Sequence, residues 1–444
     1  MSGTPPGVLP LGRLLAYAAP ALPLALLGLP LNVHLPNFWA GPMGVRLGLV
    51  GLVLTLVRLM DVVVDPAIGR ISDRYRTRIG RRRPPILLAV PVGIAGGTAL
   101  FFPPAGAGAV WLAGSYALLT IGWSLIALPW QAWGAELSED YAERTRIVSV
   151  RESFTLLGII ASAVLPFALH LTDPASVLHL LALLCFGLTL PALALLLLVV
   201  PETKPIDHPE PAGLALALRT AWDNMAFRRL LAAWTLNGIA NGMPATLFLL
   251  LCRYVLQAEA QSGLLLLAFF LTGILSVPGW NWLAGRIGKH RTWCWAMIWT
   301  CAAFLPVLLL GPGDWKAFLL ICLATGAGLG ADLVLPPAMQ ADVVDLDTLR
   351  HGEARAGLFF AAWTMAQKAG TALSAGLAFG LLDLAGFVPD AVNTGSALTA
   401  LAVLYCLVPV LLKLCAIALV WNFPIDRAEQ GRIRAALDAI RAQN

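Results

Sequence analysis

The feature that most constrains this chain is a series of long apolar runs that recur along nearly its whole length. Runs of about 20 apolar residues match one crossing of a bilayer by a helix. A soluble protein with 59% hydrophobic and 12% charged residues could not bury so much apolar surface. The sequence therefore predicts an all-α polytopic membrane protein with twelve transmembrane helices. The predicted spans are 12–35, 44–69, 84–103, 107–136, 148–171, 175–200, 228–256, 262–286, 290–311, 315–340, 356–386 and 396–423.

The spans fall into two groups of six. Between them runs PETKPIDHPEPAG, from Pro201 to Gly213, whose proline and charge content is typical of an exposed linker. PAIGRISDR, at the end of the second span, has a counterpart in PGWNWLAGR at the end of the eighth. We therefore predict two six-helix pseudo-repeats. The predicted segments are an N-terminal bundle at 1–200, a cytoplasmic linker with an amphipathic helix at 201–227, a C-terminal bundle at 228–424 and a cytoplasmic amphipathic tail at 425–444.

The positive charges of the short loops predict the orientation. Lys and Arg residues concentrate in loops on cytoplasmic sides of membranes. Here they follow the second, fourth, eighth and tenth spans, whereas opposite loops such as PPAGAGAV carry none. We therefore expect both termini to be cytoplasmic, in a cell membrane that is most simply a bacterial inner membrane.

Two carboxylates lie where the hydrocarbon is expected. Asp61 and Asp65 follow the apolar run GLVGLVLTLV, and their spacing of four places them on one helix face. An ionised residue at membrane depth is costly unless it is compensated, which makes such residues functional candidates. Together with Arg58 they predict a cation or proton site; the alternative is a structural salt bridge with Arg58. The positions that match them in the second half are Gly273 and Val277.

Several longer stretches resemble the major facilitator superfamily, and more narrowly the glycoside–pentoside–hexuronide:cation symporters, the melibiose permease group. The resemblance covers essentially the whole chain and implies a cation-coupled transporter of two six-helix halves. The stretches that carry it are DVVVDPAIGRISDRYRTRIGRRRPP, YAERTRIVSVRESF, LNGIANGMPATLF and LPPAMQADVVDLDTLRHGEARAGLFFAAWTMAQKAG.

The resemblance implies roles for individual residues. It assigns the coupling cation to Asp61 and Asp65, with help from the hydroxyl of Ser124. An Asn beside the second acid favours sodium in that family; this chain has Val64 there, which favours a proton. Lys368 and Arg151 match cationic residues of the family's helices eleven and five.

The family's sugar-binding acids are missing from this chain. No Asp or Glu precedes Asp61, and the helix-four position is Ala127. Because carboxylates hold sugar hydroxyls by charge-assisted hydrogen bonds, a galactoside is poorly supported. Aromatic and amide groups could still hold a sugar, and the cationic residues could attract an anionic head. The residues that we expect to bind substrate are Arg58, Trp130, Gln131, Arg151, Asn237, Asn241, Asp332, Trp363, Thr364, Gln367 and Lys368.

Three of the charged or titratable residues in the spans admit other interpretations. Asp332 could contact substrate, pair with Lys368, or be a buried structural acid. Lys413 has a long stem that can reach the membrane surface, so a structural role is favoured. His34, at the end of the first span, is interpreted as an interfacial hydrogen-bonding group rather than a proton relay.

Charged residues at the predicted cytoplasmic ends suggest latches that stabilise one conformation and break in another. These gate candidates are Asp73, Arg74, Arg81, Arg286, Asp342 and Asp345.

The sequence thus predicts a cation-coupled symporter, driven by H⁺ or Na⁺, that carries a small sugar, glycoside or uronate-like solute by alternating access. One alternative is a lysolipid or other amphiphile carrier of the same fold; another is a non-transporting membrane sensor or assembly factor. Motifs typical of hydrolases, metalloproteases and nucleotide-binding enzymes do not occur, so we expect no enzymatic activity and no cofactor. No nucleic-acid partner and no metal beyond a sodium ion at Asp61 and Asp65 are expected, and the protein is predicted to be a monomer.

Overall fold

The computed structural model describes residues 9–74, 77–138, 141–171, 173–202, 224–351, 356–389 and 391–443. Apart from one isolated bridge between Thr77 and Gly80, every regular element in these ranges is helical. The chain divides into two compact units: unit 1 is Met1–His208 with Val388–Val392, and unit 2 is Pro209–Phe387 with Asn393–Asn444. The predicted all-α architecture is confirmed. Most of the predicted linker, with its amphipathic helix, lies outside the described residues.

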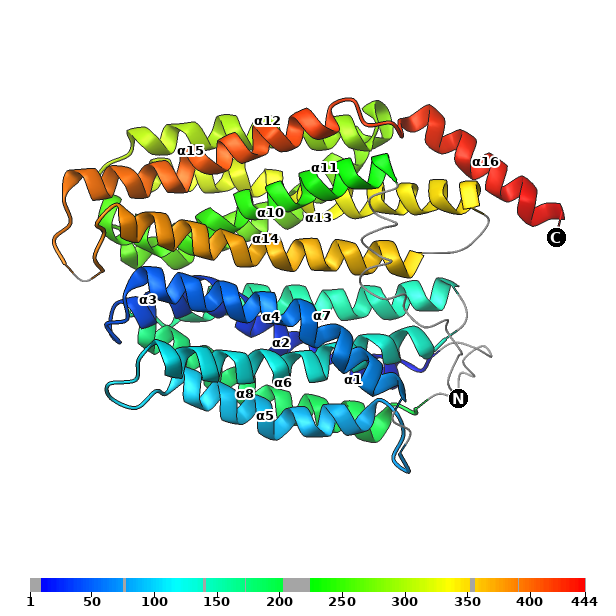
Figure 1. Ribbon diagram of the computed structural model, residues 1–444, viewed down its shortest axis with the longest axis horizontal. Coiled ribbons are helices and arrows are strands. Elements are labelled where there is room, and N and C mark those ends of the chain that lie inside the picture. Colours follow the sequence, from blue (N-terminus) through cyan, green and yellow to red (C-terminus); the bar gives the residue numbers. More distant parts are fainter. Residues whose placement is uncertain are drawn as a thin grey trace. The chain divides into compact units, whose positions relative to one another are not determined.

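Unit 1 is built from long helices and a shorter, broken first segment (Figure 1). Its elements are α1 (Leu11–Ala18), α2 (Ala21–Leu29), the π-helix η1 (Pro30–His34), α3 (Leu35–Ala40), α4 (Leu47–Arg74), α5 (Arg83–Phe101), α6 (Ala109–Glu136), α7 (Tyr141–Ala168) and α8 (Pro174–Val199).

Unit 2 has a similar set of helices and ends in a shorter terminal helix. Its elements are α10 (Met225–Leu250), η2 (Leu251–Val255), η3 (Glu259–Gln261), α11 (Ser262–Ile287), α12 (Lys289–Phe304), η4 (Leu305–Leu309), α13 (Trp315–His351), α14 (Ala356–Leu384), α15 (Gly395–Val420) and α16 (Arg427–Gln443).

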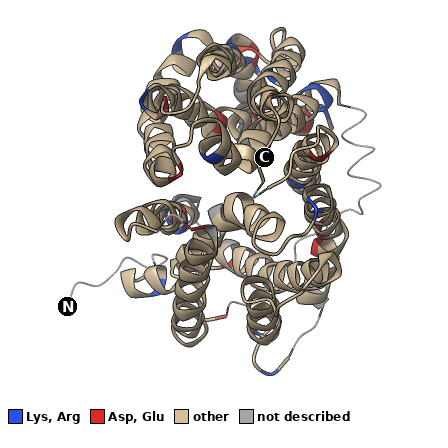
Figure 2. Cartoon of the chain, turned by 90° about the vertical axis from the view of Figure 1, so that its left-hand side faces the viewer, with Lys and Arg blue, Asp and Glu red and all other residues tan. Residues whose placement is uncertain are grey.

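Eleven helical segments among the described residues are long and apolar enough to cross a membrane. They match the predicted spans except the eleventh, which corresponds to α14. This helix has 29 residues, ample length for a crossing, but Thr364, Gln367 and Lys368 interrupt its apolar sequence. Charged residues are sparse along the helical ribbon as a whole (Figure 2).

Several helices extend beyond the predicted spans. The span expected at 148–171 begins at Tyr141, and the span expected at 315–340 continues to His351. The added turns carry charged residues. Apolar runs report only the part of a helix inside the hydrocarbon, so the predicted span starts too late for α7 and ends too early for α13.

The first span is not the single regular helix that was predicted. Pro20 separates α1 from α2, and Pro30 begins the π-helical turn that leads to His34. Proline cannot donate a backbone hydrogen bond and so interrupts the helical ladder. Such π-helical turns often occur at functional sites, and this one carries Asn32.

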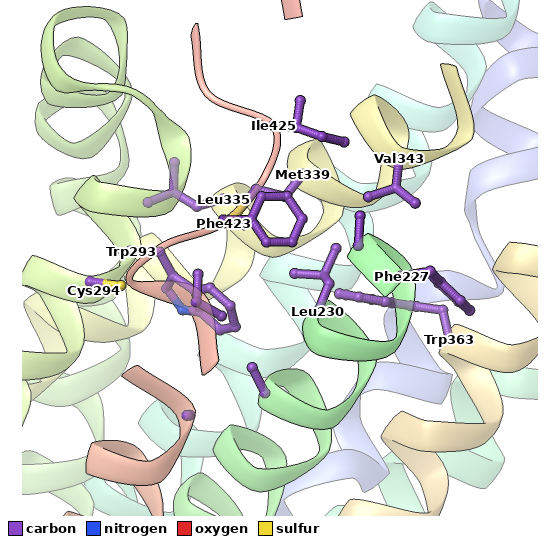
Figure 3. Packing of buried hydrophobic residues seen from close by; sticks show 14 of the residues in the cluster. Phe227, Leu230, Trp293, Cys294, Leu335, Met339, Val343, Trp363, Phe423 and Ile425 are labelled. Atoms are coloured by element: carbon purple, nitrogen blue, oxygen red, sulfur yellow. The ribbon is translucent and has the colours of Figure 1, made fainter. Parts of the chain in front are cut away.

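Each unit has its own apolar core. In unit 1 the core includes Tyr17, Trp130 and Trp133. In unit 2 it collects side chains from α10, α12, α13 and α14 and from the segment after α15 (Figure 3). Phe423 and Ile425 belong to that segment, so the chain beyond the last span is packed into the unit.

The terminal helix α16 begins with a cap and is attached to unit 2 by a buried residue and a polar contact. Asp426 accepts a hydrogen bond from the backbone N–H of Glu429 at 2.8 Å, which caps the helix and lowers the pKa of this carboxyl. Ile433 is buried in the core of the unit. Gln430 donates to Asp342 Oδ1 at 2.6 Å, which ties the tail to α13.

Glycine at position 273 lets α11 and α13 approach closely. A Cβ there would lie 3.0 Å from Leu329 Cδ2 and 3.3 Å from the carbonyl oxygen of Gly326. Small residues of this kind allow close helix packing in membranes. The position that matches Asp61 in the sequence repeat therefore has a packing role in unit 2.

The basic loop after α4 folds around two glutamates. Glu136 accepts from Arg81 at 2.6 Å and from Arg82 at 2.5 Å. Glu202 accepts hydrogen bonds from the backbone N–H groups of Arg81 and Arg82. Gly80 precedes them with φ +110°, and a Cβ on Gly80 would overlap the Glu202 carboxylate.

We therefore expect Gly80→Ala to destabilise unit 1 more than the matched variant Gly106→Ala. Both glycines have positive φ, which costs an L residue about 1–2 kcal/mol, but space around Gly106 is open. Only Gly80→Ala must also displace Glu202 from the two N–H groups. The measurement is the thermal unfolding midpoint of the purified variants. Equal decreases in the unfolding midpoints of the two variants would show that the hydrogen bonds of Glu202 do not require the absence of a side chain at position 80.

Candidate functional site

The carboxylates of the predicted cation site lie in the second half of α4. Asp61 and Asp65 are both half-buried, and the Oδ1 atom of each is sheltered from solvent. Pro66 follows directly within the helix. Because proline has no N–H, it cannot donate to the carbonyl of Val62 one turn earlier. A backbone oxygen thus becomes available between the two acids, in a segment that already presents negative charge.

Arg58, one turn before Asp61, is held by groups from two other segments of unit 1. Its Nε donates to the Tyr116 hydroxyl on α6 at 3.1 Å. Its Nη2 donates to Oδ1 of Asn32 in the π-helix. Asn32 in turn donates to the carbonyl of Gly28 at 2.6 Å. The break in the first span therefore positions an amide that orients the guanidinium.

His34, two residues after Asn32, is buried. No residue in the part of the chain that the structure covers hydrogen-bonds to its Nδ1 atom. The expectation of an interfacial hydrogen-bonding group is not met at this nitrogen.

The three predicted residues of α6 differ in their exposure to solvent. Ser124 is buried on a helix that packs along α4. Trp130 is buried in the core, where its Nε1 donates to the carbonyl of Tyr17 at 2.8 Å. Gln131 is exposed on the surface of the unit. Among the three, only Gln131 has a side chain open to a solute approaching this unit.

Arg151 on α7 has a charged neighbour that sequence reasoning did not identify. Its guanidinium bonds Glu152 Oε1 at 2.7 Å from Nη2 and 3.0 Å from Nε. It also lies 5.9 Å from the centre of the Trp130 ring. Consecutive residues on a helix do not face each other, so the spacing gave no signal of this pair. A solute that binds Arg151 would compete with Glu152.

In unit 2, the predicted residues of α14 form a polar stripe beside a buried tryptophan. Thr364 and Gln367 are exposed and Lys368 is half-buried, and their spacing of three and four places them on one face. Trp363 is buried and stacks on Trp234 of α10, with ring centres 4.7 Å apart and planes 12° apart.

The remaining predicted residues of unit 2 belong to one buried polar cluster, which we call the Asp332 cluster. It consists of Asp332 on α13, Asn237 and Asn241 on α10, Trp293 on α12 and Lys413 on α15. Asp332 accepts from Asn241 at 2.8 Å and from the Trp293 indole at 2.7 Å. Figure 3 shows the Trp293 ring in the core of this unit.

Lys413 supplies the positive charge of the Asp332 cluster. Its Nζ lies 3.6 Å from Asp332 Oδ2 and donates to Asn237 Oδ1 at 2.6 Å. The exposed fractions are 7% for Asp332, 4% for Lys413 and 0% for Asn237. The expectation that Lys413 extends to the membrane surface is wrong, because buried oxygen atoms hold its ammonium inside the unit. Asp332 thus has Lys413 as an ion-pair partner.

The gate candidates lie at the ends of helices, and several have partners within their own unit. Arg81 bonds Glu136, as described above, and Asp342 pairs with Lys289 at 2.6 Å. Arg286 lies over the ring of Trp282 at 3.9 Å, and Asp345 is half-buried. The side chains of Asp73 and Arg74 lie outside the described part of the structure.

Comparison with known proteins identifies a family. Residues 16–427 match the family described as MFS/sugar transport protein. The fold resembles the crystal structure of a D-xylose–proton symporter, with a TM-score of 0.66, 12% identity and coverage of 94% of this chain and 98% of the other.

The relatives include sugar-related and lipid-related carriers. The chain is 26% identical to an uncharacterised symporter of Synechocystis sp., covering 97% of each. It is 24% identical to the sodium-dependent lysophosphatidylcholine symporter 1 of Gallus gallus, covering 88% of this chain and 82% of the relative. It is 23% identical to the glucuronide carrier protein homolog of Escherichia coli, covering 91% of each.

We expect Lys413→Met to lower the stability of unit 2 by about 3–5 kcal/mol, because it leaves a buried carboxylate without its counter-charge. Adding Asp332→Asn should recover most of this loss, since no charge then remains in the cluster. The matched control is Lys316→Met, an exposed residue on α13, which should change stability by less than about 0.5 kcal/mol. Thermal unfolding of the purified variants measures all three. A double variant no more stable than Lys413→Met would contradict this account of the pair.

Proposed function

The chain belongs to the MFS/sugar transport protein family, and from this premise we propose that it is a cation-coupled symporter of a small organic solute that works by alternating access. The resemblance to the glycoside–pentoside–hexuronide:cation symporters is confirmed by relatives that include a glucuronide carrier homolog and a glycoside/cation symporter of Escherichia coli. The chain is a multi-pass membrane protein, and we place both of its termini in the cytoplasm.

The observation that carries the proposal is the pair of carboxylates on α4. Asp61 and Asp65 share one face of a helix that otherwise has the composition of a membrane span. The helix α6, which packs along α4, carries the buried hydroxyl of Ser124, and Pro66 leaves the Val62 carbonyl of α4 without its helical donor. Oxygen-rich groups with a net negative charge suit a hard cation and equally accept a proton.

Coupling follows from the cost of charge in the hydrocarbon. When the site is empty, Arg58, Asp61 and Asp65 on α4 carry one positive and two negative charges, so a net negative charge remains among these three residues. Binding of a cation neutralises that charge and stabilises the conformations in which the carboxylates are removed from water. A ligand that prefers one conformation shifts the population toward it, and through this shift the cation and the solute become linked.

The substrate that we favour is a sugar-related anion such as a uronate or glucuronide. Arg58 and Arg151 in unit 1 and Lys368 in unit 2 are the cationic groups among the proposed binding residues, and guanidinium groups hold carboxylates by paired hydrogen bonds. The acid that would grip the hydroxyls of a neutral galactoside is replaced by Ala127. Gln131, Thr364 and Gln367 are exposed within their units and can bond hydroxyl groups.

A lysolipid is the second candidate, because relatives named lysophosphatidylcholine symporters match most of the chain. Its phosphate would bind the same arginines, and position 127 carries an apolar Ala rather than an acid. Only the lysolipid has a long apolar tail, so an experiment that compares ligands with and without an acyl chain can distinguish the two candidates.

Asp61→Asn and Asp65→Asn should each abolish uphill transport. In vesicles with an imposed proton or sodium gradient, we expect accumulation of the solute to fall to about the passive ratio of 1, because the cation no longer contributes free energy. The matched control is Glu429→Gln, on the terminal helix α16, which removes only an exposed ion pair with Arg432 and should transport like the parent. If both Asp variants accumulate solute as the parent does, the cation site lies elsewhere.

A thermal-shift panel separates the substrate classes. Ligands that bind the folded state raise its apparent stability. We expect glucuronate and aryl glucuronides to raise the unfolding midpoint, and more so with sodium or at lower pH, whereas neutral galactosides have no effect. A rise with lysophosphatidylcholine, absent with glycerophosphocholine, would instead favour the lipid carrier, because only the former has an acyl chain.

A further inference from the structure

The Asp332 cluster brings oxygen atoms from two helices around one positive charge in the interior of unit 2. Asp332 lies near the middle of the Trp315–Arg350 span and Lys413 within the Gly395–Val420 span. The ammonium of Lys413 faces Asn237 Oδ1 at 2.6 Å and Asp332 Oδ2 at 3.6 Å. A carboxylate oxygen and an amide oxygen are the ligand types that hard cations prefer.

The hydrogen bonds around Asp332 fit an ionised carboxylate. Trp293 and Asn241 donate to its two oxygens, and an indole N–H or an amide NH₂ can only donate. A carboxylate with both oxygens engaged by donors still carries a full negative charge in an apolar helix. It therefore needs a cation, and Lys413 provides one from the same chain.

The orientation of Asn237 indicates that the oxygen atoms are arranged for the cation. Its Oδ1 accepts from Lys413, while its Nδ2 is buried without a hydrogen-bond partner among the described residues. A buried donor that is left unsatisfied is costly. The side chain of a residue with no exposed surface thus gives up a donor bond in order to present oxygen to the positive charge.

We propose that the Asp332 cluster is a binding site for a monovalent cation that the Lys413 ammonium fills permanently. Unit 2 then retains a cation cage that does not exchange its ion. The exchangeable coupling ion is confined to unit 1, and the charge inside unit 2 stays balanced whichever ion drives transport. Removal of the ammonium opens the cage to sodium.

The test measures sodium-dependent stability in a protein that lacks the acids of α4. In the Asp61→Asn, Asp65→Asn background, the thermal unfolding midpoint is compared in sodium chloride and in choline chloride of equal ionic strength. We expect no difference in this background, because the Lys413 ammonium occupies the cage. Adding Lys413→Met should produce a saturable rise of several degrees with sodium, and adding Asp332→Asn to that variant should remove the rise.

If the variants fold, any one of three results would overturn the proposal. A sodium response in the background with Lys413 intact would show that the ammonium does not keep sodium out. A Lys413→Met variant whose stability depends on pH but not on sodium would show that Asp332 takes up a proton instead. The third is a Lys413→Met variant that is stable and responds to neither ion.

The outcome stays decisive if Lys413→Met does not fold in choline. Lys413→Gln retains a polar group beside Asn237 and serves as the second variant, with folding followed by size-exclusion chromatography in each salt. Folding in sodium but not in choline supports the proposal. Failure of both variants in both salts contradicts it, because sodium is then unable to take the place of the ammonium. The result does not depend on the coupling role proposed for Asp61 and Asp65.

Discussion

The constraint behind the polar features of this protein is that a charge within an apolar helix must be compensated where it lies. Water is not available in the hydrocarbon, so each ionised side chain needs an opposite charge or several hydrogen bonds. Lys413 and Asp332 meet this requirement by pairing within the interior of unit 2. On α4, Arg58 lies one turn before Asp61 and two turns before Asp65, and Tyr116 and Asn32 hold its guanidinium.

The two units use corresponding positions of the sequence repeat for different purposes. Asp61 on α4 matches Gly273 on α11, where the missing side chain allows close contact with α13. A carboxylate at position 273 would meet Leu329 and the Gly326 carbonyl. The absence of an acid at position 273 therefore has a steric reason in unit 2, and the presence of Asp61 in unit 1 has a proposed chemical reason. This division supports a single exchangeable cation site.

The predicted cytoplasmic ends of the helices are held by networks within each unit. Glu136 and Glu202 gather the basic loop after α4, and Asp342 joins Lys289 of α12 to Gln430 of the terminal helix. Asp342 of α13 therefore connects the terminal helix α16 to α12 and α13. The basic loops that predict the orientation in the membrane therefore also have a structural role.

The sequence by itself determined the helical class, nearly all of the spans, the family and the acids of α4. The helical class, the spans and the acids follow from properties that are local: the length of an apolar run, the cost of a charge inside it and the spacing of residues on one face. The family followed from the resemblance of longer sequence stretches. The sequence did not reveal that Lys413 turns inward, that Glu152 pairs with Arg151, or that a π-helical turn carries Asn32 to Arg58. Those features depend on which helices pack together and on where proline breaks the backbone ladder. Only the tertiary structure decided them, because a long side chain takes the direction in which its charge finds oxygen, and the oxygens that hold Lys413 come from helices far away in the chain.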